Sequence, residues 1–178
     1  VAMSAAAGGI GTSKTRKMDT GMKWTIKRST DEDLHEVLGF LRADYLDRRP
    51  EGNGEDESSG SFYHHSHQIS EAHKIGNLTV LTDTTSRKVD GYITGNPTTG
   101  HGEVLQVFRN RRNGRGKALA KHFIQCAKEQ GAIGVAATCA PHTSVEFWEG
   151  LGFQRGIQVL DNPSTQPQRF YIFPSSSI

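Results

Sequence analysis

The stretch of this chain with the clearest chemical potential is a basic turn with two glycines, RRNGRGK, at residues 111–117. Glycine lets the backbone approach a ligand closely, and here Gly114 and Gly116 lie two residues apart. An apolar stretch precedes the turn and a helix-like stretch follows it, which predicts that the turn begins a helix. The unpaired N–H groups and the dipole of a helix N-terminus favour anions, phosphates above all. The turn is therefore a candidate phosphate-binding site.

The charge around the turn supports this hypothesis. Arg111, Arg112, Arg115 and Lys117 add positive charge, and no acidic residue occurs from position 104 to position 128. The alternative is an ordinary strand–helix turn whose cations are solvated, and the turn by itself leaves this alternative open.

Two common phosphate-binding motifs do not fit the residues present. A Walker A loop needs glycine where the chain has Arg111, and serine or threonine where it has Ala118. The dinucleotide-binding motif G-x-G-x-x-G needs a third glycine where the chain has Leu119. A different class of phosphate ligand is therefore expected.

Hydrophobic patterning along the chain predicts the elements that position this turn. Alternation and β-propensity predict strands at 23–29, 77–83, 89–95, 102–109, 132–140, 153–160 and 168–174. Caps and amphipathic spacing predict helices at 31–48, 116–130 and 144–151, whereas 51–70 is expected to be a loop. The predicted fold class is mixed α/β, with a central mixed sheet, helices on both faces and a right-handed parallel crossover over 102–140.

The first predicted helix has the most complete set of sequence signals. Thr30 and Asp33 have the spacing of a capping box. Apolar residues then recur at i, i+3, i+4 and i+7 spacing from Leu34 to Tyr45, which predicts an amphipathic helix.

Composition limits the classes of protein to consider. The chain has 178 residues and a net charge of +2, which suits one domain without a global field for nucleic acid or membranes. No apolar run approaches the ~20 residues of a membrane span. Cys126 and Cys139 fall in a predicted helix and strand, which favours a reduced, cytoplasmic protein. We expect a single domain over 23–175, preceded at 1–22 by a tail that is either flexible or added by cloning, with Met18 or Met22 as natural start.

Two motifs and the order of elements together resemble a known family. Residues 111–116 match the pattern R/Q-x-x-G-x-G/A, and SVEFWEGLGF at 144–153 is similar to the fourth-helix pattern A-x-x-x-Y-E-x-x-G-F. Both patterns belong to the GCN5-related N-acetyltransferase (GNAT) family, which the predicted order of elements also resembles over 23–175.

This resemblance implies a sheet of about six to seven strands with a splayed parallel pair, and acetyl-CoA as acyl donor without a metal. It implies that the backbone of Val107, Phe108 and Arg109 pairs with the pantetheine arm. It also implies that the turn binds the pyrophosphate through Arg111, Arg112, Asn113, Gly114, Arg115, Gly116 and Lys117.

The implied reaction moves an acetyl group directly to a primary amine, which must lose a proton to attack. A lysine-like amine has a pKa of about 10.4, so neutralising it at pH 7 costs roughly 4–5 kcal/mol and a general base helps. The resemblance places this base at Glu103, which is otherwise an exposed strand-end carboxylate. His101, with its better unperturbed pKa, is the second candidate.

The leaving thiolate is the second catalytic problem. Family members commonly supply a proton from a tyrosine on the fourth helix, where this chain has Trp148, whose indole N–H is not a usable acid. With a pKa near 8.5, the thiolate can leave unprotonated, which we favour. Ser144 or His142 can instead replace the acid, or the chain is an inactive acetyl-CoA-binding sensor or scaffold.

The remaining expectations concern ligands and partners. Three histidines, His64, His65 and His67, are weak evidence for a metal site. We interpret them as part of a polar loop that either contacts the amine acceptor, a small molecule or a peptide, or lies at the surface. The basic cluster is compact and local, so nucleic acid is not an expected partner. The resemblance is also compatible with a homodimer.

Overall fold

A computed structural model describes residues 23–48, 62–138, 144–155 and 168–174 of the chain. Its strands are β1 (Trp24–Arg28), β2 (Leu78–Asp83), β3 (Val89–Asn96), β4 (His101–Val107), β5 (Gly134–Thr138), β6 (Gln154–Arg155) and β7 (Gln168–Ile172). Its helices are α1 (Asp31–Arg48), the short 3₁₀ helix η2 (Phe62–His65), α2 (Ser66–Lys74), α3 (Arg115–Glu129) and α4 (Val145–Glu149).

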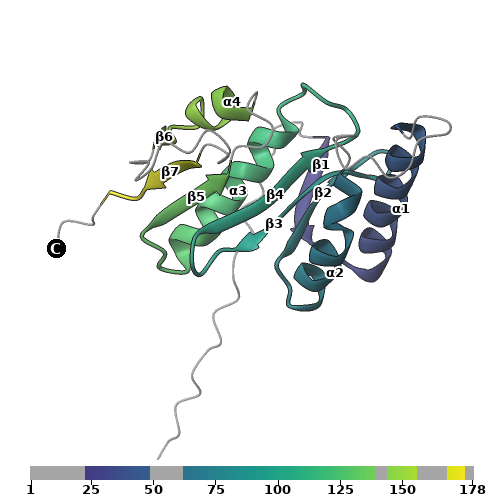
Figure 1. The fold of residues 1–178 in the computed structure, drawn as a ribbon, viewed down its shortest axis with the longest axis horizontal. Helices are drawn as coiled ribbons and strands as arrows, with labels where there is room; N and C mark the ends of the chain where they lie inside the picture. The colour runs from purple at the N-terminus through teal and green to yellow at the C-terminus, as the bar shows by residue number, and fades with distance from the viewer. Residues whose placement is uncertain (1–22, 49–61, 139–143, 156–167, 175–178) are drawn as a thin grey trace, which may run out of the picture.

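The strands form one seven-stranded sheet in the order β1-β2-β3-β4-β5-β7-β6 (Figure 1). All neighbours are antiparallel except β4 and β5, the pair joined through α3. Among the described residues, this parallel pair is joined only where His101 and Gly102 lie opposite Ala136 and Ala137, although β4 continues to Val107. The mixed sheet and the splayed parallel pair are therefore confirmed.

Helices cover both faces of the sheet (Figure 1), and each face has its own core. On one face, α1 and α2 bury Leu41 and Ile69 against Tyr92 of β3. On the other, α3 buries Leu119 and Phe123. Since β4 lies in the middle of the sheet, both cores fix its position.

The predicted capping box starts α1. The Thr30 N–H donates to Asp33 Oδ2 over 2.9 Å, and the Asp33 N–H donates to Thr30 Oγ1 over 3.3 Å. From the predicted apolar stripe, Val37 and Leu41 have no exposed surface. Local caps and helical periodicity therefore suffice for this element.

The prediction of a loop over 51–70 is wrong for 62–70, where η2 and the first part of α2 lie. Two buried residues three positions apart, Ile69 and Ala72, attach α2 to the α1 side of the core. Gly76, at φ 78°, follows the helix. The polar composition of the segment concealed this short apolar stripe. Residues 49–61 lie outside the described residues.

The other elements follow the expected order, and their described ends differ from the predicted ones by a few residues. Positions 139–140 and 156–160 of the predicted strands lie outside the described residues. β4 ends at Val107, two residues before the predicted end. Cys126 lies in α3 as expected, whereas Cys139 lies outside the described part of the chain. None of the helices found in that part is long and apolar enough to cross a bilayer.

Candidate active site

The turn between β4 and α3 has the backbone geometry of an anion site. Asn110, Arg112 and Gly114 have positive φ values of 51°, 66° and 79°. The first helical bond runs from the Ala118 N–H to the Gly114 carbonyl, so the N–H groups of the first turn precede the helical ladder. Left-handed residues at the start of such a turn make the N–H groups converge on a concavity that binds anions.

Among the described residues, the edge of β4 that faces β5 has no strand partner beyond Gly102. The Phe108 N–H donates to the carbonyl of Asp90 in β3, and backbone groups alternate direction along an antiparallel strand. The backbone groups of Leu105 and Val107 therefore face the opposite way, into the gap left by β5. In agreement, the Val107 carbonyl accepts a bond from Arg111 Nε over 3.1 Å. An extended ligand with amide groups can pair with this edge.

At two of the three expected strand positions the backbone N–H groups are already bonded within the sheet, so a contact there stays a prediction for the carbonyl groups alone. The N–H groups of both Phe108 and Arg109 donate to the Asp90 carbonyl, over 2.9 and 3.1 Å, so neither is left for a ligand. The Phe108 ring stacks on Phe40 inside the core. The open-edge residue that the sequence prediction missed is Leu105, and strict alternation from Val107 would have identified it.

A cavity of about 600 Å³ occupies the gap between the splayed strands and continues to the start of α3. Its volume suits a small-molecule site. Most of the residues that line it come from β4, β5, the β4–α3 turn and the α4 region, and these include Glu103, Leu105, Val107, Gly114, Gly116, Ser144, Phe147 and Trp148. The β4–α3 turn and the open edge of β4 therefore belong to one cavity.

Of the two predicted bases, Glu103 is the one that the structure places at this cavity. Glu103 is the first β4 residue after the paired segment ends at Gly102, and it is exposed. His101 lies opposite Ala136 in the paired segment and is not among the described residues that line the cavity. The role of Glu103 as a base stays a prediction.

The structure also shows where the candidate hydrogen-bond or proton donors to the leaving thiolate lie. Ser144 lines the cavity, and its buried Oγ has no hydrogen-bond partner among the described residues. Trp148 lines the cavity as well, and its ring packs against Phe147 and Phe153 with centroid distances of 5.1 and 5.0 Å. His142 lies outside the described residues. A hydroxyl without a partner at this wall fits a ligand that accepts a hydrogen bond.

The four cations of the turn do not share one orientation. Arg112 and Lys117 are exposed and line the cavity, and Arg111 and Asn113 are exposed beside it. Arg115 is 5% exposed, and its guanidinium binds Asp90 and Asp83. The expectation that all four cations add charge for a ligand is therefore wrong for Arg115, whose charge is compensated by acids from the β2–β3 hairpin.

The segment before α2 contributes one residue to the cavity. His65 lines it, and its Nδ1 lies 2.7 Å from Gln68 Oε1. His64 and His67 are not among the described residues that line this cavity. In the described part of the chain, no group of three or more His, Cys, Asp or Glu side chains is arranged to hold a metal ion. Contact between His65 and an acceptor stays a prediction.

Comparison with known proteins identifies the fold. No protein-family model and no curated protein matches the sequence. The structure is similar to a mosquito arylalkylamine N-acetyltransferase-like protein, 5b, at a TM-score of 0.63 and 13% identity, covering 84% of this chain and 100% of that one. It is similar to a GNAT-family acetyltransferase from Staphylococcus aureus Mu50 (TM-score 0.59, 13% identity, 84% and 98% covered).

A third similar structure is the PaiA N-acetyltransferase from Thermoplasma acidophilum in complex with coenzyme A. Its TM-score is 0.60 at 14% identity, covering 85% of this chain and 100% of that one. At such identities the likeness establishes the fold. The chain has the GNAT fold, and the resemblance found in the sequence is confirmed at that level.

Proposed function

We propose that residues 23–175 form an acetyl-CoA-dependent N-acetyltransferase that moves an acetyl group directly to a primary amine. The observation that carries this proposal is the cavity that joins the anion-binding turn at α3 to the open edge of β4. Acyl-CoA has the matching parts, a charged pyrophosphate and an extended arm with amide groups. The similar PaiA structure is a complex with coenzyme A, which supports the same donor here.

The acetyl-CoA donor would lie along the cavity, with its pyrophosphate at the β4–α3 turn and its thioester near Glu103. The N–H groups of the turn and the first turn of α3 hold the pyrophosphate, and Arg112 and Lys117 compensate its charge. The backbone groups of Leu105 and the N–H of Val107, whose carbonyl already accepts a bond from Arg111, pair with the amides of the pantetheine arm. The thioester then reaches the part of the cavity that Glu103 lines.

The proposed reaction needs one general base and a leaving group that can depart without being protonated. The neutral amine nitrogen attacks the thioester carbonyl carbon, and the carbon–sulfur bond breaks with its electron pair on sulfur. The Glu103 carboxylate first takes the proton from the ammonium form of the amine, directly or through water, and the nitrogen loses its second proton to water as the amide forms. Ser144 Oγ, buried and without a described partner, donates a hydrogen bond to the departing sulfur. The acceptor enters beside Glu103 and His65, and is a small-molecule or peptide amine.

One observation favours a second candidate, a module that binds acetyl-CoA as a sensor or scaffold without turnover. Trp148 stands where related sequences commonly have tyrosine, and its indole cannot protonate a thiolate. Because a thiolate with a pKa near 8.5 leaves without this help, we favour the enzyme. Release of CoA with any amine would exclude the binding module.

The first test is calorimetric titration of the purified protein with acetyl-CoA and with CoA, followed by CoA-release assays with a panel of primary amines. Micromolar binding and release of CoA are the expected results. No binding at millimolar ligand would reject the proposal, and binding without release would favour the sensor.

The second test concerns the base. We expect Glu103→Gln to lower kcat about a hundredfold near neutral pH, a typical contribution of general-base catalysis. The loss should shrink at alkaline pH, where the amine is already neutral. A pH–rate profile like that of the wild type would assign the proton to His101 or to water.

A further inference from the structure

We propose that Asp90 is a positioning residue for the coenzyme A site, whose carboxylate holds the β4–α3 turn in its anion-binding conformation. This inference rests on the proposed function and goes further, because Asp90 lies on β3 and is not among the described residues that line the cavity.

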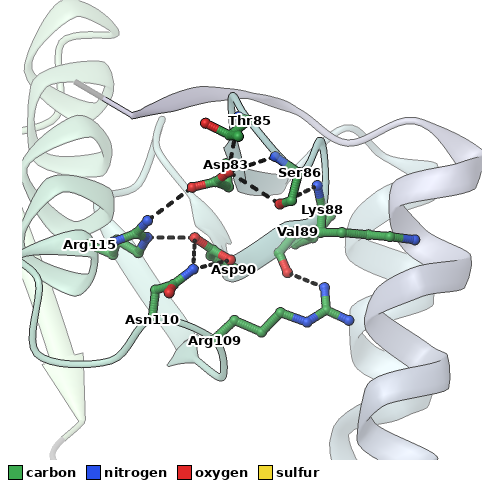
Figure 2. A network of polar contacts seen from close by, with 9 residues as sticks. All are labelled: Asp83, Thr85, Ser86, Lys88, Val89, Asp90, Arg109, Asn110 and Arg115. Atoms are coloured by element: carbon green, nitrogen blue, oxygen red, sulfur yellow. Dashed lines mark hydrogen bonds and ion pairs between the residues drawn. The ribbon is translucent and has the colours of Figure 1, made fainter. Parts of the chain in front are cut away.

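Asp90 bonds to the turn at both of its ends (Figure 2). Its side chain is fully buried, and its carboxylate accepts bonds from Arg115 Nε over 2.5 Å and from Asn110 Nδ2 over 3.1 Å. Its backbone carbonyl accepts the N–H groups of Phe108 and Arg109. One residue of β3 therefore fixes the last residues before the turn and the first residue of α3.

The turn needs such support because of its backbone. Two of its residues with side chains, Asn110 and Arg112, have positive φ values, a region that residues with a Cβ rarely adopt. Such conformations persist where the surrounding structure determines them, and they cluster at functional sites. The bonds of Asp90 lie on either side of the strained residues, so they restrict the turn from both ends.

A second acid fixes the guanidinium that Asp90 binds. Asp83 Oδ2 accepts a bond from Arg115 over 3.2 Å, and the Trp24 ring lies over the guanidinium at 4.9 Å. Asp83 Oδ1 in turn accepts the N–H groups of Thr85 and Ser86 over 3.0 and 2.8 Å (Figure 2). The β2–β3 hairpin thus holds Arg115 in one place from two sides.

The network affects the proposed pyrophosphate site through the position of Arg115. Arg115 is the first residue of α3, and the N–H groups that would hold a pyrophosphate belong to it and its neighbours. Buried ion pairs are weak sources of stability compared with apolar packing, but their bonds have a fixed direction. The network therefore sets where the helix N-terminus points and where its N–H groups converge.

The test uses the full-length protein with two ligands. Asp90→Asn keeps the shape of the side chain and removes its charge. We expect the Kd for CoA to rise about tenfold, the effect of weakening a hydrogen bond to a charged group. We expect kcat/KM for S-acetyl-pantetheine, an acyl donor without the pyrophosphate, to stay within about twofold of wild type.

Lys88→Met is the matched control. Lys88 precedes β3 on the same hairpin, its side chain points away from the network in Figure 2, and it forms no ion pair with any described residue. Its CoA affinity should equal that of wild type. An unchanged Kd for CoA in Asp90→Asn would overturn the inference, and so would an equal loss of kcat/KM with acetyl-CoA and with S-acetyl-pantetheine.

A second variant covers the case in which Asp90→Asn does not fold. Asn110 is exposed and has φ 51°, so Asn110→Gly keeps the backbone conformation and removes the amide that reaches Asp90. We expect about threefold weaker CoA binding with an unchanged melting temperature, and an unchanged Kd would refute the inference. If the wild type binds no CoA, the proposed function is wrong. If the wild type binds CoA and the variants bind it equally well, only this inference is wrong.

Discussion

The β4–α3 turn has an inner cation, Arg115, and three outer cations, Arg111, Arg112 and Lys117, and these two groups differ in what surrounds them. The inner cation is 5% exposed and binds two carboxylates. The outer cations are exposed and form no ion pair among the described residues. Residues of one charge type within seven positions therefore have different surroundings, and we propose different roles for them: the inner cation shapes the turn, and the outer cations present charge to a ligand.

The difference predicts two kinds of energetic effect. Removing one member of a buried charged set leaves the others without compensation, and this destabilises the fold strongly. Exposed cations contribute little to folding, and salt screens their effect on a ligand. Variants of the inner cation should change the free energy of unfolding, and variants of the outer cations should change the affinity for CoA.

The largest expected effect belongs to Arg115→Met, which removes the inner cation and leaves Asp90 and Asp83 buried. The free energy of unfolding should fall by about 3–5 kcal/mol, measured by urea denaturation. Lys121→Met, at an exposed cation of the same helix, should change it by less than about 0.5 kcal/mol. Equal stability of the two variants would remove the distinction between inner and outer cations.

The next effect is on affinity, at Gly114→Glu. Gly114 has φ 79° and lies at the start of α3, so glutamate adds strain and places an anion where the pyrophosphate is proposed to lie. We expect CoA binding to weaken about a hundredfold or more, measured by calorimetry. Gly131 is a matched control, because it has φ 82° and open space at the other end of α3. Gly131→Glu should bind CoA as wild type does, and a similar loss in both variants would contradict the pyrophosphate site.

A smaller effect is expected for the outer cation Arg112. Arg112→Met should weaken CoA binding about threefold at low ionic strength, and the difference should disappear in high salt because exposed charges are screened. Arg87 is also exposed, with φ 57° in the β2–β3 turn, so Arg87→Met controls for charge and backbone conformation. A salt-independent loss in Arg112→Met would mean that this cation acts through structure, as Arg115 does.

The smallest effect concerns pH and the inner network. The hydrogen bond from the Ser86 N–H, followed by the Thr85 N–H, the Ser86 hydroxyl and the Arg115 charge, lowers the pKa of Asp83 against the opposing effect of burial. A lowered pKa stabilises the fold above the unfolded pKa of about 3.9, and this stabilisation is lost as pH falls through the folded pKa. Asp83→Asn should therefore be less stable than wild type at pH 6, and urea denaturation at pH 3 should show a smaller difference. A constant difference would exclude ionisation as its source.

Local signals predicted most of the fold. The Thr30–Asp33 capping box and the apolar spacing of α1 are properties of neighbouring residues, so they are visible in the sequence. The helix α2 was missed because its attachment to the core depends on Ile69 and Ala72 within a polar segment. Only the three-dimensional structure shows that these two buried residues are enough to attach the helix to the core.

The sequence predicted the chemistry of the candidate site, but it did not predict the orientation of its side chains and backbone groups. The glycine spacing located the turn, but the sequence does not show that Arg115 points inward. Its partners Asp83 and Asp90 lie 32 and 25 positions earlier, brought beneath it by the pairing of β2 with β3. The engagement of the Phe108 and Arg109 N–H groups was not visible for the same reason, because their bonds to Asp90 are set by the register of the sheet.

The open segment of β4 also bears on aggregation. An unpaired strand at the border of a sheet is a template for strands of other molecules. Here the unpaired segment lies in the interior of the sheet, with β3 on one side and the diverging β5 on the other. Because flanking strands stand on both sides, a second sheet cannot align with this edge, while a single narrow chain can enter. The splay therefore exposes backbone hydrogen-bonding groups to a slender ligand without offering them to a neighbouring protein.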